Sequence, residues 1–227
     1  MAVPAVPIAS SRLPIASVDI KVAVGIVIAA TAICTLVLVA DQWWGVDHYQ
    51  LVRDPNAIAN NPNYFGLVSN LGIVMWIAGA VGALQAVAAL RQTREKAFSG
   101  LLLAGGCFAA VMGLDDLLML HESIAATGIP EILVLGPHAI LLAATCYRAW
   151  LLQGRTPWLL LVACVAAFGC SMVVDVVPVE FAGQVFIEES FKLLGIMFLT
   201  AYLVITSQKA LRSAPHDGFR QTSFEDL

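Results

Sequence analysis

The chain has 227 residues, of which 59% are hydrophobic and only 12% are charged, and its formal net charge is −4. The mean hydropathy is +0.84. A soluble domain carries about 25% charged residues, so this composition excludes an ordinary soluble globular protein. The basic residues form no stripe outside short connecting segments, and nucleic acid is therefore not expected as a partner.

Apolar runs of about 20 residues, each long enough to cross a hydrocarbon core of about 30 Å, recur along the chain. We expect an all-α, polytopic transmembrane helical bundle of six spans as one domain over residues 19–207. A flexible tail (1–18) precedes it, and a cytoplasmic tail (208–227) follows it. The first run is longer than a signal-peptide core and is expected to remain as an anchor. The expected spans are 20–41, 64–90, 99–120, 131–150, 157–177 and 183–206.

The basic residues predict the orientation of these spans. With both termini in the cytoplasm, only Arg53 falls in an outer loop and Lys192 within a span, which leaves ten of the twelve basic residues on the inner side. Inner loops of membrane proteins carry such an excess of Lys and Arg. We therefore expect a multi-pass protein of the plasma (inner) membrane, with the lipid bilayer as its partner and an even number of spans.

Ionisable residues interrupt two of the apolar segments, in the stretches GLDDLLMLHE and FIEESFKLLG. Charged groups within a membrane are costly, so they usually face the protein interior, pair with one another and mark a working site. The expected topology brings them to the outer half of the bundle, together with polar residues from the ends of other spans. The residues within the two stretches are Asp115, Asp116, His121, Glu122, Glu188, Glu189 and Lys192, and those that join them are Asp41, His138 and Asp175.

Helical periodicity predicts how the residues of the third span are arranged. Asp115 and Glu122 are seven positions apart, so they would share one face of a continuous helix. Asp116 and His121 would project about 100° or more away from that face. This spacing predicts a polar face formed by Asp115 and Glu122.

The last span carries the sequence EESFK. Glu188 and Glu189 precede Lys192 by four and three positions, so either carboxylate can pair with the ammonium group. An acid of the third span is the other expected partner, because a paired ammonium keeps its charge inside a membrane.

Parts of the chain resemble known families. EESFK resembles the EExxK motif of the PrsW-type glutamic intramembrane proteases, in which paired glutamates are thought to activate water. That resemblance implies that Glu188 and Glu189 are a catalytic pair. VSNLG, with Ser69 and Asn70, is similar to part of the pattern of the alkaline-ceramidase superfamily of zinc enzymes. Most of the chain also looks like uncharacterised bacterial multi-pass membrane proteins, a resemblance that implies no activity.

These features favour a membrane-embedded hydrolase that acts on a lipid or on a membrane-buried peptide. An oxygen-rich cluster could also hold a divalent metal ion such as manganese, calcium or iron. Lys192 would be the charge partner, with Asp175, His138 and Asp41 around the site. The expected catalytic residues are Glu188, Glu189, Asp115 and Asp116, and the expected metal ligands are His121, Glu122, Asp115 and Glu188.

Two other functions fit the same residues. Chains of acidic residues, histidines and lysines relay protons within membranes, which favours a proton- or cation-coupled carrier. A buried ion-pair network could instead fix the register of the helices and do no chemistry. The sequence leaves the substrate, the metal and the oligomeric state open.

Overall fold

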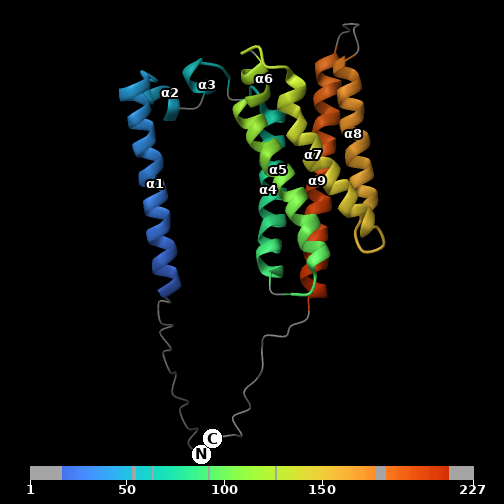
Figure 1. Cartoon of the computed structure of the whole chain (residues 1–227). Coiled ribbons are helices and arrows are strands. Elements are labelled where there is room, and N and C mark those ends of the chain that lie inside the picture. The colour runs from blue at the N-terminus through green and yellow to red at the C-terminus, as the bar shows by residue number, and fades with distance from the viewer. Residues whose placement is uncertain are drawn as a thin grey trace, which may run out of the picture. The chain divides into compact units, whose positions relative to one another are not determined.

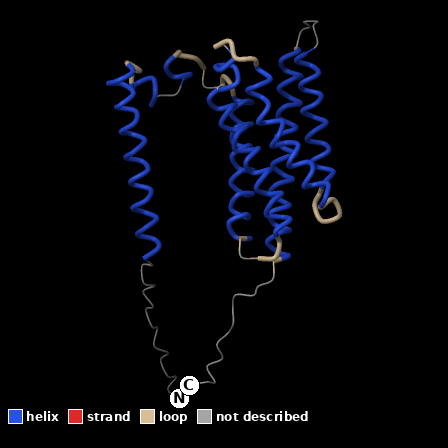
Figure 2. Tube along the Cα trace, viewed as in Figure 1, coloured by secondary structure: helices blue, strands red, loops and turns tan. Residues whose placement is uncertain are grey.

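The computed structural model contains only α-helices as regular elements in the part of the chain that it describes (Figures 1 and 2). The chain divides into two compact units, residues 1–65 and 66–227, where the sequence suggested one domain over 19–207. Most of both predicted tails lies outside the described residues. The described residues are 17–52, 55–62, 64–91, 93–125, 127–176 and 183–214.

The first unit contains the long helix α1 (Ser17–Trp44) and two short helices, α2 (His48–Val52) and α3 (Pro55–Ile58). Gly45 lies between α1 and α2 with a φ of 66°, a backbone conformation that glycine adopts without steric cost. The turn brings His48 back onto α1, where its Nδ1 lies 2.9 Å from Oδ2 of Asp41. Asp41, which the sequence placed beside the polar site, thus pairs inside the first unit.

The second unit contains the remaining helices, and four of the described helices are long and apolar enough to cross a membrane: α4, α5, α8 and α9. The prediction of an all-α protein with membrane-length apolar helices is therefore confirmed. The last helix continues to Ser213, beyond the predicted end of the span at residue 206. The bounds are α4 (Leu67–Leu90), α5 (Lys96–Leu118), α6 (Leu120–Ala125), α7 (Glu131–Leu151), α8 (Trp158–Val176) and α9 (Gln184–Ser213).

Helix α4 packs against both α5 and α9, while α8 packs against α9 and α7 packs against α5 (Figure 1). The indole of Trp76 is fully buried at the centre of this arrangement. It stacks on Phe168 of α8 with a centroid distance of 5.8 Å and meets Phe108 of α5 edge-on at 5.6 Å. These aromatic contacts, together with the surrounding Leu and Ala side chains, form the core of the second unit.

Small residues let these helices approach closely. A Cβ atom added to Gly106 of α5 would lie 3.1 Å from the Cβ of Ala83 on α4. A Cβ on Gly113 would lie 3.0 Å from the Cβ of Trp76. Small residues on α4 and α5 therefore serve helix packing, as they commonly do in membrane proteins.

Gly195 of α9 tests the importance of this close packing. A Cβ at Gly195 would lie 2.8 Å from the ring of Phe168, which itself stacks on Trp76. We expect Gly195→Ala to lower the free energy of unfolding by about 1–3 kcal/mol, because overpacking displaces the ring. Thermal unfolding of the purified protein measures the change.

Gly169→Ala on α8 is the matched control, because no atom lies within 4 Å of a Cβ added there. Because alanine has a higher helix propensity than glycine, this substitution should leave the free energy of unfolding unchanged or raise it by up to about 1 kcal/mol. Equal melting temperatures for the two variants would contradict the packing argument.

Candidate functional site

Asp116, in the last turn of α5, receives hydrogen bonds from two other helices. Trp76 on α4 donates from Nε1 to Oδ2 at 2.9 Å, and Lys192 on α9 donates from Nζ to Oδ1 at 2.9 Å. The Asp116 side chain is only 7% exposed, and that of Lys192 is 29% exposed. The lysine of EESFK therefore pairs with an acid of the third span, one of the partners that the sequence allowed.

A small cavity of about 10 Å³ adjoins this ion pair. Polar side chains from three helices contribute to its lining: Ser69 from α4, Asp116 from α5, and Glu189 and Lys192 from α9. A volume of about 10–15 Å³ with two to four polar partners holds one water molecule. The cavity therefore has the size and the polar lining that a single bound water requires.

Glu188 and Asp175 extend the negative charge beside the cavity. Glu188 is half-buried on α9 and interacts electrostatically with Glu189, with Lys192 and with Asp175 at the end of α8. The start of α9 is also tied to the end of α8, because Gln184 donates from Nε2 to the carbonyl oxygen of Val174 at 2.9 Å. Several carboxylates therefore surround one ammonium group at this end of α9.

The prediction of a continuous helix over 99–120 is wrong, because α5 ends at Leu118. Met119 adopts a left-handed conformation with a φ of 47°, and its N–H bonds to the carbonyl oxygen of Asp115. A new helix, α6, begins at Leu120. This break interrupts the helical periodicity from which a shared face of Asp115 and Glu122 was predicted. The side chain of Glu122 lies outside the described part of the structure.

The same break turns His121 back towards Asp115, where the sequence had it project away. Asp115 Oδ1 accepts a hydrogen bond from the backbone N–H of His121 at 2.8 Å. Nδ1 of the His121 ring lies 2.7 Å from Asp115 Oδ2. The carboxylate thus satisfies a backbone donor in the first turn of α6, as a helix-capping side chain does.

His138 of α7 approaches the same carboxylate. Its Nε2 lies 3.7 Å from Asp115 Oδ2, and the histidine and aspartate side chains are 12% and 3% exposed. Pro137 precedes His138 inside α7. Two imidazole rings, one from α6 and one from α7, therefore approach the same carboxylate oxygen of Asp115.

The two neighbouring aspartates consequently contact different helices. Successive residues of a helix project about 100° apart, so Asp115 meets α6 and α7 while Asp116 meets α4 and α9. Carboxylates at the C-terminal end of a helix oppose its macrodipole. The contacts with Lys192, Trp76 and His121 offset that disadvantage.

The structure thus resolves the single predicted cluster into two groups that meet at the end of α5. Trp76 was missed by the sequence interpretation, although a tryptophan in the middle of an apolar segment needs a partner for its indole N–H. Among the described residues, no three His, Cys, Asp or Glu side chains are placed to hold a metal ion. The metal prediction is therefore without support there. One group contains Asp115, His121 and His138, and the other contains Trp76, Asp116, Lys192, Glu189 and, at its edge, Glu188 and Asp175.

The fold and the site define a class of protein: an all-helical protein with several membrane-length helices and a buried polar cluster between them. The chain belongs to the family described as a domain of unknown function (DUF8692), whose match covers residues 23–206. Comparisons with curated proteins and with solved structures found no match.

Removal of Lys192 tests how tightly the ion pair holds the bundle. We expect Lys192→Met to lower the free energy of unfolding by about 3 kcal/mol, because it leaves a buried carboxylate without its cation. The double variant Lys192→Met with Asp116→Asn should lose less than the sum of the two single variants, as coupled partners do. Denaturant titration of the purified protein measures all three.

Lys209→Met is the control for that series, since Lys209 is exposed near the end of the same helix. It should change stability by less than about 0.5 kcal/mol. Strictly additive losses in the double variant would show that the two side chains do not stabilise each other.

The left-handed residue between α5 and α6 gives a second test. Met119 is 58% exposed, so its side chain contributes little packing. Met119→Gly should raise the unfolding free energy by about 1 kcal/mol, because glycine has no Cβ to strain the left-handed conformation. Met119→Val should lower the melting temperature, and a destabilised glycine variant would contradict the assignment of the break.

Proposed function

We propose that this protein is a multi-pass protein of the plasma (inner) membrane, with six spans and both termini in the cytoplasm. Besides the four helices already named, α1 has 28 residues and α7 has 21. An α-helix of about 20 residues is long enough to cross a hydrocarbon core of about 30 Å. Among the described residues, the end of the second unit that faces away from Asp116 carries seven basic residues and one acid, Glu95, which supports its placement at the inner side. The seven are Arg91, Arg94, Lys96, Arg148, Arg155, Lys209 and Arg212.

Within that protein, the polar cluster hydrolyses a lipid or a membrane-buried peptide. One observation carries this proposal: the water-sized cavity lies against Glu189, Lys192 and Asp116. A carboxylate beside a bound water is the arrangement for general-base catalysis. An ammonium group beside the same water can stabilise the negative charge that develops on a carbonyl oxygen during attack.

In this mechanism Glu189 takes a proton from the water as the water oxygen bonds to the carbonyl carbon. Lys192 stabilises the tetrahedral oxyanion. The bond to the leaving alcohol or amine then breaks, and the proton held by Glu189 passes to that leaving group. Asp116 is a positioning residue, because its hydrogen bonds with Lys192 and Trp76 fix the ammonium beside the cavity.

The second group of side chains would support this reaction from the other face of α5. Asp115 orients His121 through a contact of 2.7 Å. Glu188 precedes Glu189 on α9, and Asp175 at the end of α8 interacts with Glu188. These two acids would add negative charge near the base.

A proton-coupled carrier is the second candidate, and a separate observation favours it. Oδ2 of Asp115, a side chain that is only 3% exposed, lies 2.7 Å from His121 Nδ1 and 3.7 Å from His138 Nε2. Acid and histidine groups from neighbouring helices in this arrangement can pass protons along a chain. Substrate-dependent pH changes inside proteoliposomes would distinguish this function from hydrolysis.

The hydrolase proposal is tested with purified protein in lipid vesicles, incubated in ¹⁸O-labelled water with phospholipid esters or with membrane-spanning peptides. We expect ¹⁸O to enter the carboxylate of the cleaved product, detected by mass spectrometry. Glu189→Gln should lower the rate by about 10²–10⁴-fold, the usual contribution of a general base, while the melting temperature stays unchanged.

Asp47→Asn is the matched control, because Asp47 is an exposed acid in the first unit. It should keep the full rate. Product without ¹⁸O, or an active Glu189→Gln variant, would overturn the assignment of Glu189. Metal analysis of the same preparation tests the separate expectation of a divalent ion.

A further inference from the structure

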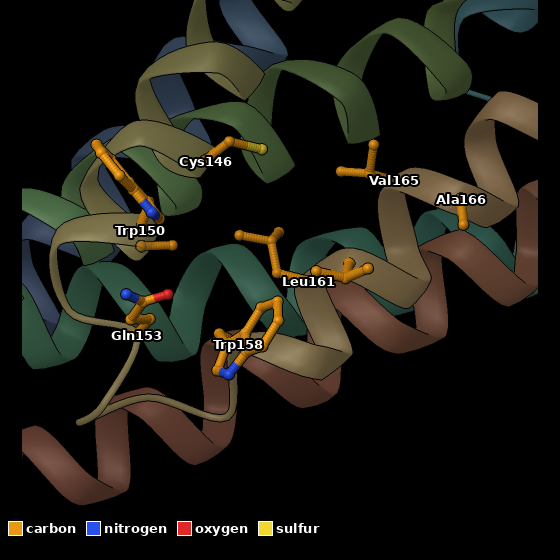
Figure 3. A pocket seen from close by; sticks show the side chains of 9 residues that line it. Cys146, Trp150, Gln153, Trp158, Leu161, Val165 and Ala166 are labelled. Atoms are coloured by element: carbon orange, nitrogen blue, oxygen red, sulfur yellow. The ribbon is translucent and has the colours of Figure 1, made fainter.

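An apolar groove lies between α7 and α8, away from the polar cluster. It has a volume of about 420 Å³ and is open on one side. Figure 3 shows side chains of both helices facing it across the space between them. The residues used below are Cys146, Trp150, Gln153, Trp158, Leu161 and Val165.

The lining of this groove is almost wholly apolar along its length and polar only near its end. Leu161 and Val165 form one wall on α8, and Cys146 lies opposite them on α7 (Figure 3). Trp150 and Trp158 flank the end nearest the α7–α8 connection, where they are 65% and 43% exposed. Tryptophans of this kind sit at the boundary between the hydrocarbon core and the head groups.

The groove ends at the strongly basic end of the second unit. Gln153 lines its mouth, and Arg155 follows two residues later in the same connection. Arg155 also joins this connection to the α4–α5 connection, because its Nη2 lies 2.9 Å from Glu95 Oε2. Arg148 lies on α7 one turn before the helix ends; it is exposed, and its guanidinium group lies against Gly100 of α5. Only Glu95 offsets the seven basic residues of this end among the described residues.

We propose that the groove between α7 and α8 binds one acyl chain of an anionic phospholipid, with the phosphate group at its basic end. An apolar channel within membrane-length helices matches the chain, and the Gln153 amide, together with the positive charge of this end of the unit, matches the phosphate. The site depends on the membrane placement proposed above but not on hydrolysis. It lies at the opposite ends of α7 and α8 from His138 and Asp175, so the bound lipid is not the substrate of the polar cluster.

Fluorescence quenching tests the groove directly. In the full chain carrying Trp43→Phe and Trp44→Phe, emission comes from Trp150, Trp158 and the buried Trp76. The protein is reconstituted in vesicles that contain a small fraction of brominated lipid, either phosphatidylglycerol in phosphatidylcholine or the reverse. Each basic residue near the surface favours an anionic lipid roughly fivefold. We therefore expect brominated phosphatidylglycerol to quench at a fraction at least fivefold lower than brominated phosphatidylcholine.

Two matched substitutions on α8 separate the groove from general attraction to the basic surface. Val165→Phe fills the groove, whereas Val173→Phe alters an exposed position of the same helix that does not line it. Val165→Phe should abolish the preference for the anionic lipid, and Val173→Phe should keep it. Gel filtration and thermal unfolding check that both variants fold.

Three results would overturn the proposal. Equal quenching by the two brominated lipids would mean that the groove has no preference for anionic lipid. A preference that survives Val165→Phe would assign it to the basic surface alone. Quenching that falls as the protein-to-lipid ratio rises would show that a second copy of the chain covers the groove.

Discussion

The bundle depends on a single carboxylate that three helices share. Asp116 of α5 accepts one hydrogen bond from α4 and one from α9, each at 2.9 Å. The desolvation of a buried charge is expensive unless it is paired and fully hydrogen-bonded, so these helices are held to one register in which both donors reach the carboxylate. Trp76 supplies one of those donors and also stacks in the aromatic core. Core packing and site geometry are therefore coupled through one side chain.

The membrane-length helices and the approximate place of the polar cluster could be predicted from the sequence. The length of an apolar run and the position of a charge within it are properties of the local sequence. They do not depend on how the helices pack. The choice among the acids that could pair with Lys192 is not local. Two of them lie on its own helix, three and four positions earlier, yet the lysine bonds to Asp116, 76 residues earlier in the chain. That choice depends on how α4, α5 and α9 pack, and the glycines at their contacts determine that packing.

The break at Met119 could not have been predicted from residue types. Left-handed residues that end helices are usually glycine or asparagine, and methionine carries no such preference. Helical periodicity across residues 115–122 therefore placed His121 away from Asp115, whereas the break brings the two to 2.7 Å. The backbone N–H and the ring of His121 both meet the carboxylate of Asp115. Tertiary contacts thus offset the strain of a conformation that the local sequence does not favour.

Adjacent aspartates at the end of one helix make the two halves of the site mechanically dependent on each other. A shift of the last turn of α5 that lengthens the contact of Asp116 with Lys192 must also move Asp115 relative to His121 and His138. The negative end of the helix dipole disfavours the charge of both carboxylates. Loss of the Lys192 ammonium beside Asp116 would therefore leave more uncompensated negative charge next to Asp115. α7 carries this dependence further, because His138 near its start contacts Asp115 and its last two turns line the apolar groove.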